Sequence, residues 1–131
     1  MKLTLSKIRD YFKNDFKWSD KISSGKIDNN QEKAICFYNS DRALSYQPVI
    51  GNKDLKSTYV KPIAILLRYT QNQNSAEIKA QEIYEFFEKR TFSIENKRVF
   101  VEMYNEEPIC LGTDENGVYE YSIEINLFVE R

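Results

Sequence analysis

The chain has 131 residues and is 41% hydrophobic, with nine Tyr, eight Phe and one Trp, which is enough for one folded domain over residues 1–131. Its 19 basic and 20 acidic residues give a net charge of −1. This balance argues against a dedicated nucleic-acid-binding domain, because such domains carry a basic excess. The sequence has no histidine, which excludes catalytic and metal sites that use histidine. It also lacks a signal peptide and an apolar stretch of membrane-spanning length, so we expect no membrane association.

The N-terminal region predicts a short amphipathic helix. Residues 4–14 place four apolar side chains on one face, and Thr4 is a plausible N-cap. Residues 16–22 then predict extended chain, and the Ser-Ser-Gly sequence at 23–25 predicts a turn. Both cysteines, Cys36 and Cys110, lack a CxxC pattern, which predicts reduced thiols of a cytosolic protein.

Three apolar segments in the middle of the chain predict strands. Residues 34–38 form a short apolar run, and residues 45–50 predict an edge strand because Pro48 cannot donate a hydrogen bond to a neighbouring strand. A turn is predicted at 51–54. Residues 59–70 are apolar without alternation, which predicts a central strand covered on both faces.

The clearest helix is predicted over residues 75–91. Asn74 as N-cap and Glu77 at the third helical position match a capping box. Its apolar face is Ala76, Ala80, Ile83, Tyr84 and Phe87. A strand with alternating residues over 98–104 follows, and the polar turn at 95–97 leads into it.

The C-terminal segment predicts a hairpin turn and a long strand. The turn is placed at 114–117, where Asn116-Gly117 tolerates the positive φ of tight hairpin turns. Side chains then alternate over 119–131, with one apolar and one polar face, apart from Phe128. Together these elements predict an α+β fold, in which an antiparallel-dominated sheet carries two main helices on one face.

Sequence motifs offer weak alternatives for chemistry. Glu95-Asn96-Lys97 matches the Glu-x-Lys core of many Mg²⁺-dependent nucleases, but it occupies a position where a turn is needed. The acidic residues near the last turns suggest a cation site, although such clusters are more often solvated loops: Glu106, Glu107, Asp114 and Glu115. Tyr119 and Tyr121 match a base-stacking platform or, more commonly, a strand core. We predict no enzyme activity, no metal and no cofactor.

Most of residues 16–131 resembles one known protein family. The resemblance is carried by residues 76–84 and 108–121, with shorter matches at 25–28, 34–39 and 49–51. Its most specific part is Gly-x-Asp-x-x-Gly-x-Tyr-Glu-Tyr over 112–121. The sequence is similar to the minor capsid protein family of tailed bacteriophages and prophages, which is related to the phage tail terminator and tail completion proteins. It departs from that family at Asn52, where a second glycine is common.

The resemblance implies a structural virion protein at the head–tail junction. Such proteins form a ring, commonly a hexamer, that ends the tail tube and contacts tail-tube and head-connector proteins. DNA passes through the channel without specific binding. A head-side connector of similar fold is the alternative within the virion. The expected localisation is the virion and, during assembly, the host bacterial cytoplasm.

Polar faces of the predicted elements are the candidate subunit interface. A long terminal strand offers an edge for a neighbouring copy, and the polar side of the main helix offers a second surface. We expect charge reversal of Glu120 and Glu124 to disturb assembly. The candidate interface residues are Glu120, Glu124, Asp114, Glu115, Glu85 and Glu88.

Overall fold

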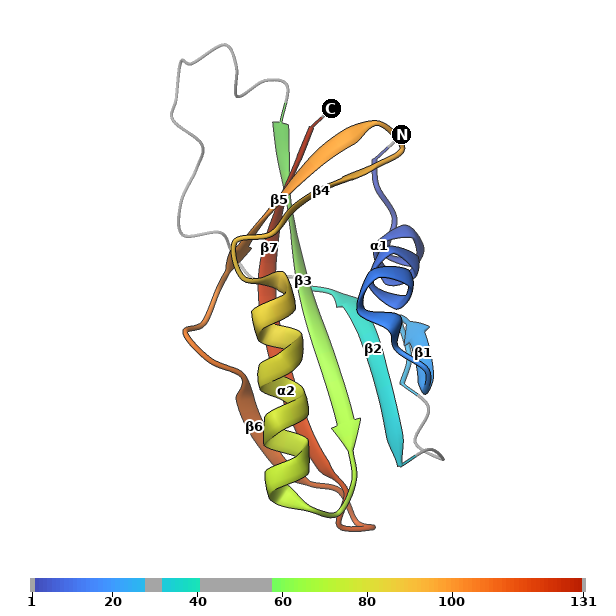
Figure 1. Cartoon of the computed structure of the whole chain (residues 1–131), viewed down its shortest axis with the longest axis vertical. Coiled ribbons are helices and arrows are strands. Elements are labelled where there is room, and N and C mark those ends of the chain that lie inside the picture. Colours follow the sequence, from blue (N-terminus) through green and yellow to red (C-terminus); the bar gives the residue numbers. More distant parts are fainter. Residues whose placement is uncertain (1, 28–31, 41–57, 131) are drawn as a thin grey trace.

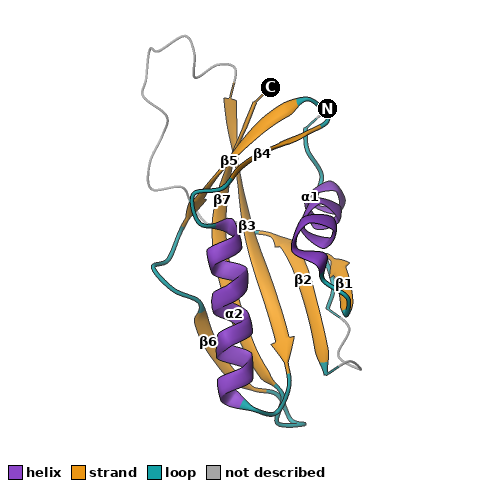
Figure 2. Ribbon diagram, viewed as in Figure 1, coloured by secondary structure: helices purple, strands orange, loops and turns teal. Residues whose placement is uncertain are grey.

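The computed structural model describes residues 2–27, 32–40 and 58–130 and has an α+β fold (Figures 1 and 2). The predicted strand at 45–50 and turn at 51–54 lie outside these residues. The described elements are, in order, α1 (Leu5–Phe12), the π-helical turn η1 (Lys13–Lys17), β1 (Lys21–Ser24), β2 (Lys33–Asn39), β3 (Thr58–Tyr69), α2 (Gln73–Phe87), β4 (Thr91–Ile94), β5 (Lys97–Met103), β6 (Ile109–Thr113) and β7 (Tyr119–Glu130).

The described strands form one sheet in the order β1-β2-β3-β7-β5-β4, and β6 also pairs with β7. Strand β7 is the centre of this arrangement, because it pairs with β3 on one side and with both β5 and β6 on the other. Strand β6 lies beside the first half of β7 and β5 beside the second half. Only β1 and β2 run parallel among these pairs. The prediction of an antiparallel-dominated sheet is therefore confirmed.

The core lies on one face of the sheet, where both helices pack. Phe37 of β2 is fully buried, and its ring centroid lies 5.5 Å from that of Phe12 in α1 and 6.4 Å from that of Phe87 in α2. The predicted apolar face of β7 joins the same cluster with Tyr121 and every second residue to Val129. Figure 1 shows both helices in front of the sheet. Adjacent residues of a strand point to opposite faces, and no helix among the described residues covers the other face, which we call the helix-free face.

Strand β3 is central, as predicted, but its two faces are not covered equally. Ile63, Ile65 and Leu67 are fully buried, whereas Ala64 and Leu66 are only partly buried. The prediction of a strand covered on both faces was wrong, because both helices lie on the same side of the sheet. An uninterrupted apolar run hides this alternation from the sequence.

The N-terminal helix ends differently from the prediction. Thr4 occupies the N-cap position without a side-chain hydrogen bond, and the α-helix stops at Phe12. A π-helical turn then includes Phe16, which was expected in extended chain. In this turn the rings of Phe16 and Phe12 are stacked, with centroids 4.8 Å apart. Ser23 and Ser24 were predicted as a turn but lie in β1, and the chain turns at Gly25, where φ is +85°.

Helix α2 also begins and ends earlier than predicted. Its N-cap is Asn72, whose side-chain oxygen accepts a hydrogen bond from the N–H of Ser75 at 3.0 Å. Asn74 lies inside the first turn, so the predicted capping box was wrong. The helix stops at Phe87, and residues 91–94, the first of them expected in the helix, form the edge strand β4. Residues 95 and 96 both have positive φ, which is the geometry of a tight hairpin turn into β5.

Candidate functional site: the helix-free sheet face and its edge

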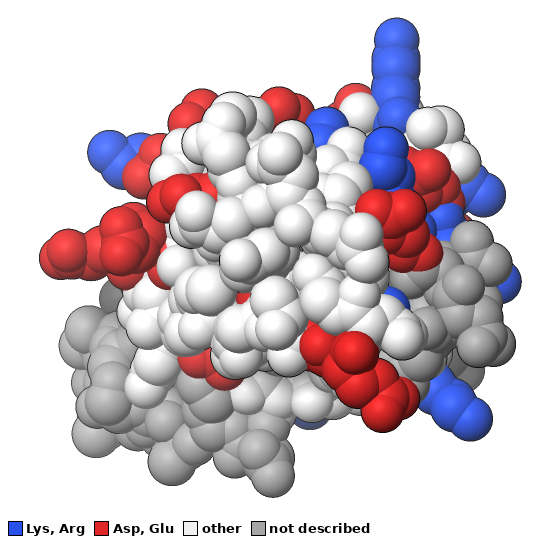
Figure 3. Space-filling model, turned by 90° about the horizontal axis from the view of Figure 1, so that it is seen from below, with Lys and Arg blue, Asp and Glu red and all other residues white. Residues whose placement is uncertain are grey.

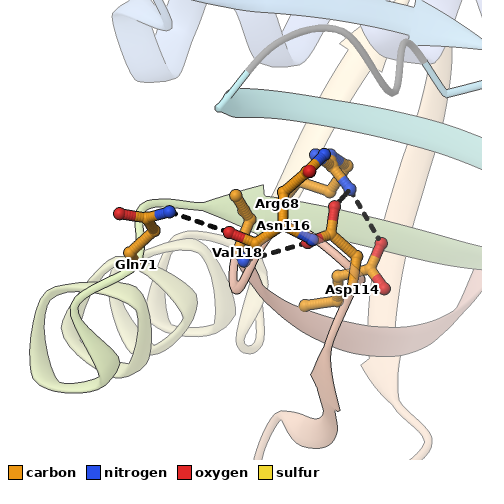
Figure 4. Close-up of polar contacts among 6 residues, drawn as sticks. Arg68, Gln71, Asp114, Asn116 and Val118 are labelled. Carbon is orange, nitrogen blue, oxygen red and sulfur yellow. Dashed lines mark hydrogen bonds and ion pairs between the residues drawn. The ribbon is translucent and has the colours of Figure 1, made fainter.

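A buried arginine anchors the last hairpin to the helix-free face. Arg68 of β3 is 2% exposed, and its guanidinium forms an ion pair with Asp114 in the turn between β6 and β7. The same nitrogen lies 3.5 Å from a carboxylate oxygen of Glu120, the residue opposite Arg68 in the β3–β7 pairing. Figure 4 shows Arg68 pointing toward Asp114 across this corner. A buried cation needs such partners, because burial without them costs several kcal/mol, on the order of 3–5.

Asp114 organises the turn as well as binding Arg68. One carboxylate oxygen accepts hydrogen bonds from the N–H groups of Asn116 at 2.9 Å and Val118 at 3.0 Å. The hydrogen bond from Val118 and the contact with Arg68 lower the pKa of Asp114 below its ordinary value of 3.8. The turn was predicted with positive φ at Asn116-Gly117, but among these two only Gly117 has it, with φ +80°.

A second contact ties this turn to the start of α2. The side-chain amide of Gln71 donates a hydrogen bond to the carbonyl oxygen of Asn116 at 2.8 Å (Figure 4). The N–H of Tyr119 donates to the carbonyl of Thr70 at 3.0 Å. The link between β3 and α2 is thus held against the link between β6 and β7, which fixes this end of the sheet.

The predicted interface residues do not form one surface. Glu120 and Glu124 alternate with core residues of β7, so they lie on the helix-free face, and Asp114 and Glu115 lie in the adjoining turn. Glu85 is exposed on α2, which covers the opposite face, and Glu88 is exposed at the C-cap of this helix. Asp114 and Glu120 also pair with Arg68 within the chain. Reversing the charge of Glu120 would therefore disturb the fold as well as any subunit contact.

Strand β6 and the end of β5 present apolar side chains to solvent. Tyr104 is 47% exposed, Ile109 37% and Leu111 54%. Exposed glutamates at positions 102, 106 and 107 are close to them in the sequence. We call these six residues the β6 edge. Residues 99–130 contain eight acidic and no basic side chains, so the whole C-terminal part of the sheet is negative. The hydrophobic pattern of the sequence did not identify this surface, although the long stretch with acidic but no basic residues was visible in the sequence.

The nuclease motif is used structurally. Glu95 lies in the hairpin turn between β4 and β5 and forms an ion pair with Lys7 of α1. The described residues contain no group of three or more His, Cys, Asp and Glu side chains that could hold a metal ion. The four acidic residues near the last turns therefore do not come together as a cation site there. Tyr121 is a core residue, and Tyr119 packs against the core.

No helix among the described residues has the length and apolar character needed to cross a bilayer. Cys36 is buried in β2, whereas Cys110 is exposed in β6. Neither cysteine forms a disulfide, in agreement with the sequence prediction of reduced thiols.

Comparison with known families identifies the chain. A family model for bacteriophage tail terminator proteins matches residues 13–131, which include every described strand and α2. No curated protein matches this chain at a significant level. The match supports the tail terminator part of the resemblance seen in the sequence. The chain therefore belongs to the bacteriophage tail terminator family and is a structural component of a phage tail.

Proposed function

We propose that this protein ends the growing tail tube of a phage or prophage and forms a ring, of six copies in the virion, at the head–tail junction. The observation that carries this proposal is the family match over residues 13–131. The ring contacts the last layer of tail-tube protein on one side and the head connector on the other. The protein acts in the virion and assembles there from the cytoplasm of the host bacterium.

The charge of the chain supports a passive channel. A ring at this position surrounds DNA as it moves between head and tail. A strongly basic lumen would hold DNA through the release of counterions, whereas this chain has a net charge of −1. DNA therefore passes through the ring without specific binding, and no catalytic step is needed.

The test is a measurement of tail-tube length. Purified protein is added to tail tubes growing from the tube protein of its own phage, and tube length is measured by electron microscopy. The controls are tubes without added protein and tubes with an unrelated protein of the same size. We expect tubes of one length that carry a ring at one end.

Two other outcomes would overturn the tail-end role. Tubes of unlimited length together with protein bound to DNA-filled heads would indicate the alternative, a head-side connector. Tubes of unlimited length and no binding to heads would show that the chain has the family fold without this function.

A further inference from the structure

We propose that, within the ring, the β6 edge of one copy lies against the β1 side of the next copy. This inference rests on the proposed function, because it names the contact that builds the ring. A ring requires two different surfaces on each copy, arranged so that the first surface of one copy fits the second surface of its neighbour. The sheet provides such a pair at its two ends.

The first surface is an exposed strand edge with apolar side chains. In the described part of the chain, β6 pairs only with β7, so its outer backbone groups face away from the sheet. All but one of its residues are exposed, and none is charged. An exposed, uncharged strand edge readily accepts another chain. The exposed side chains of Tyr104, Ile109 and Leu111 add apolar area that a partner would remove from water.

The second surface is the opposite end of the sheet. Strand β1 pairs only with β2 among the described strands, and three strands separate it from β6. At about 4.8 Å per strand spacing, the two edges lie roughly 19 Å apart across the sheet. Figure 1 shows β1 and α1 on one side of the molecule and β6 on the other.

Charge selects which surfaces meet. Residues 2–27, which form α1, η1 and β1, contain seven basic and three acidic side chains, whereas residues 99–130 contain only acidic ones. We call the four exposed lysines in η1 and in or next to β1 the β1 side: Lys13, Lys17, Lys21 and Lys26. In the view of Figure 3, most of the visible Lys and Arg side chains of the molecule lie on the right, which is the side of α1 and β1 in Figure 1.

This separation of charge favours a second copy as the occupant of the β6 edge. Two β6 edges facing each other would bring glutamates together, and two β1 sides would bring lysines together. Contact between unlike ends places Glu106 and Glu107 near Lys21 and Lys26. Complementary charges fix the register and suppress wrong pairings, even where each exposed ion pair contributes little affinity.

A paired charge reversal tests the contact. One variant carries Glu106→Lys and Glu107→Lys on the β6 edge, and the other carries Lys21→Glu and Lys26→Glu on the β1 side. Circular dichroism confirms that each is folded. Rings are counted at tube ends by electron microscopy and in solution by sedimentation velocity at low salt.

Each variant alone should fail to form rings, because every junction would then join like charges, weakening association on the order of 10- to 100-fold. An equal mixture should form rings again, since alternating copies place opposite charges at every junction. A matched control carries Glu82→Lys and Glu85→Lys on exposed α2 positions and should assemble like the unmodified protein.

Other results would refute the contact. If each edge variant alone still formed rings, the proposed β6–β1 contact would be refuted, whereas the proposed tail-end function would stand. Loss of rings only in the α2 control would move the interface to that helix. Absence of rings with unmodified protein at tube ends would overturn the proposed function and the contact together.

A cross-linking measurement does not depend on charge changes. Cys110 is exposed on β6, and Cys36 is buried. A Lys26→Cys variant should form covalent chains of copies with a bismaleimide reagent when assembled on tubes. A Glu85→Cys variant should not, and equal cross-linking of both variants would contradict the proposed contact.

Discussion

The position of the α2 N-cap predicts that alanine substitution lowers the stability of the protein at Asn72 but not at Asn74. Asn72→Ala removes the side-chain oxygen that accepts a hydrogen bond from the N–H of Ser75 at 3.0 Å. Loss of an N-cap of this kind typically costs about 1 kcal/mol of unfolding free energy. For 131 residues, an unfolding entropy of roughly 2.1 cal/mol/K per residue converts this to a Tm about 3–4 °C lower.

Asn74→Ala is the matched control, two residues away. Asn74 is exposed in the first turn of α2, where alanine is the better helix former by about 0.5 kcal/mol. We therefore expect a Tm that is unchanged or up to about 2 °C higher. Thermal and urea unfolding followed by circular dichroism measure both variants. The assignment of the cap is refuted if Asn74→Ala is destabilised as much as Asn72→Ala.

Three further predictions concern the core, the turn and the cysteines. Phe37→Ala should lower the unfolding free energy by about 3–5 kcal/mol in urea, whereas Phe100→Ala at a position 45% exposed should cost about 1 kcal/mol or less. The pKa of Asp114 is lowered in the folded state, so its contribution to stability is present above pH 3.8 and is lost as the pH falls below that value. The Asp114→Asn variant should therefore lose less unfolding free energy on acidification than the unmodified protein. An identical dependence of stability on pH in the two proteins would contradict this role. Cys110 should react with a thiol reagent in the native protein and Cys36 only after unfolding, and rapid reaction of both would contradict the burial of β2.

The long strands and the fold class were predictable because their signals are local. Alternation over 119–131 identified β7 and its buried face, and the apolar run at 59–70 identified β3 as central. The family resemblance carried by residues 76–84 and 108–121 was also sound. These features depend on residues close together in the sequence, so tertiary contacts did not override them.

Features that depend on distant contacts could not be predicted. Arg68 was visible only as a cation near the end of an apolar strand, and its partner Asp114 lies 46 residues away. The N-cap was missed for a local reason: it was placed at Asn74 by its spacing from Glu77, whereas in the structure Asn72 caps the helix and its N–H donates a hydrogen bond to the hydroxyl of Thr70. Phe16 in the turn at residues 13–17 packs against Phe86 of α2, with ring centroids 5.5 Å apart, a contact that no local pattern encodes.

The central place of β7 also constrains how the protein forms during synthesis. Pairing of β3 with β7 joins residues that are 52 to 72 positions apart, from Arg68 with Glu120 to Thr58 with Glu130. Contacts of such long range slow folding, because a large loop must close before they stabilise the chain. The partners of β7, which are β3, β5 and β6, all precede it in the chain. A nascent chain therefore cannot pair β6 with β7 until residues 119–130 have left the ribosome. Under the proposed β6–β1 contact, unfinished copies would lack one of the two surfaces that build the ring.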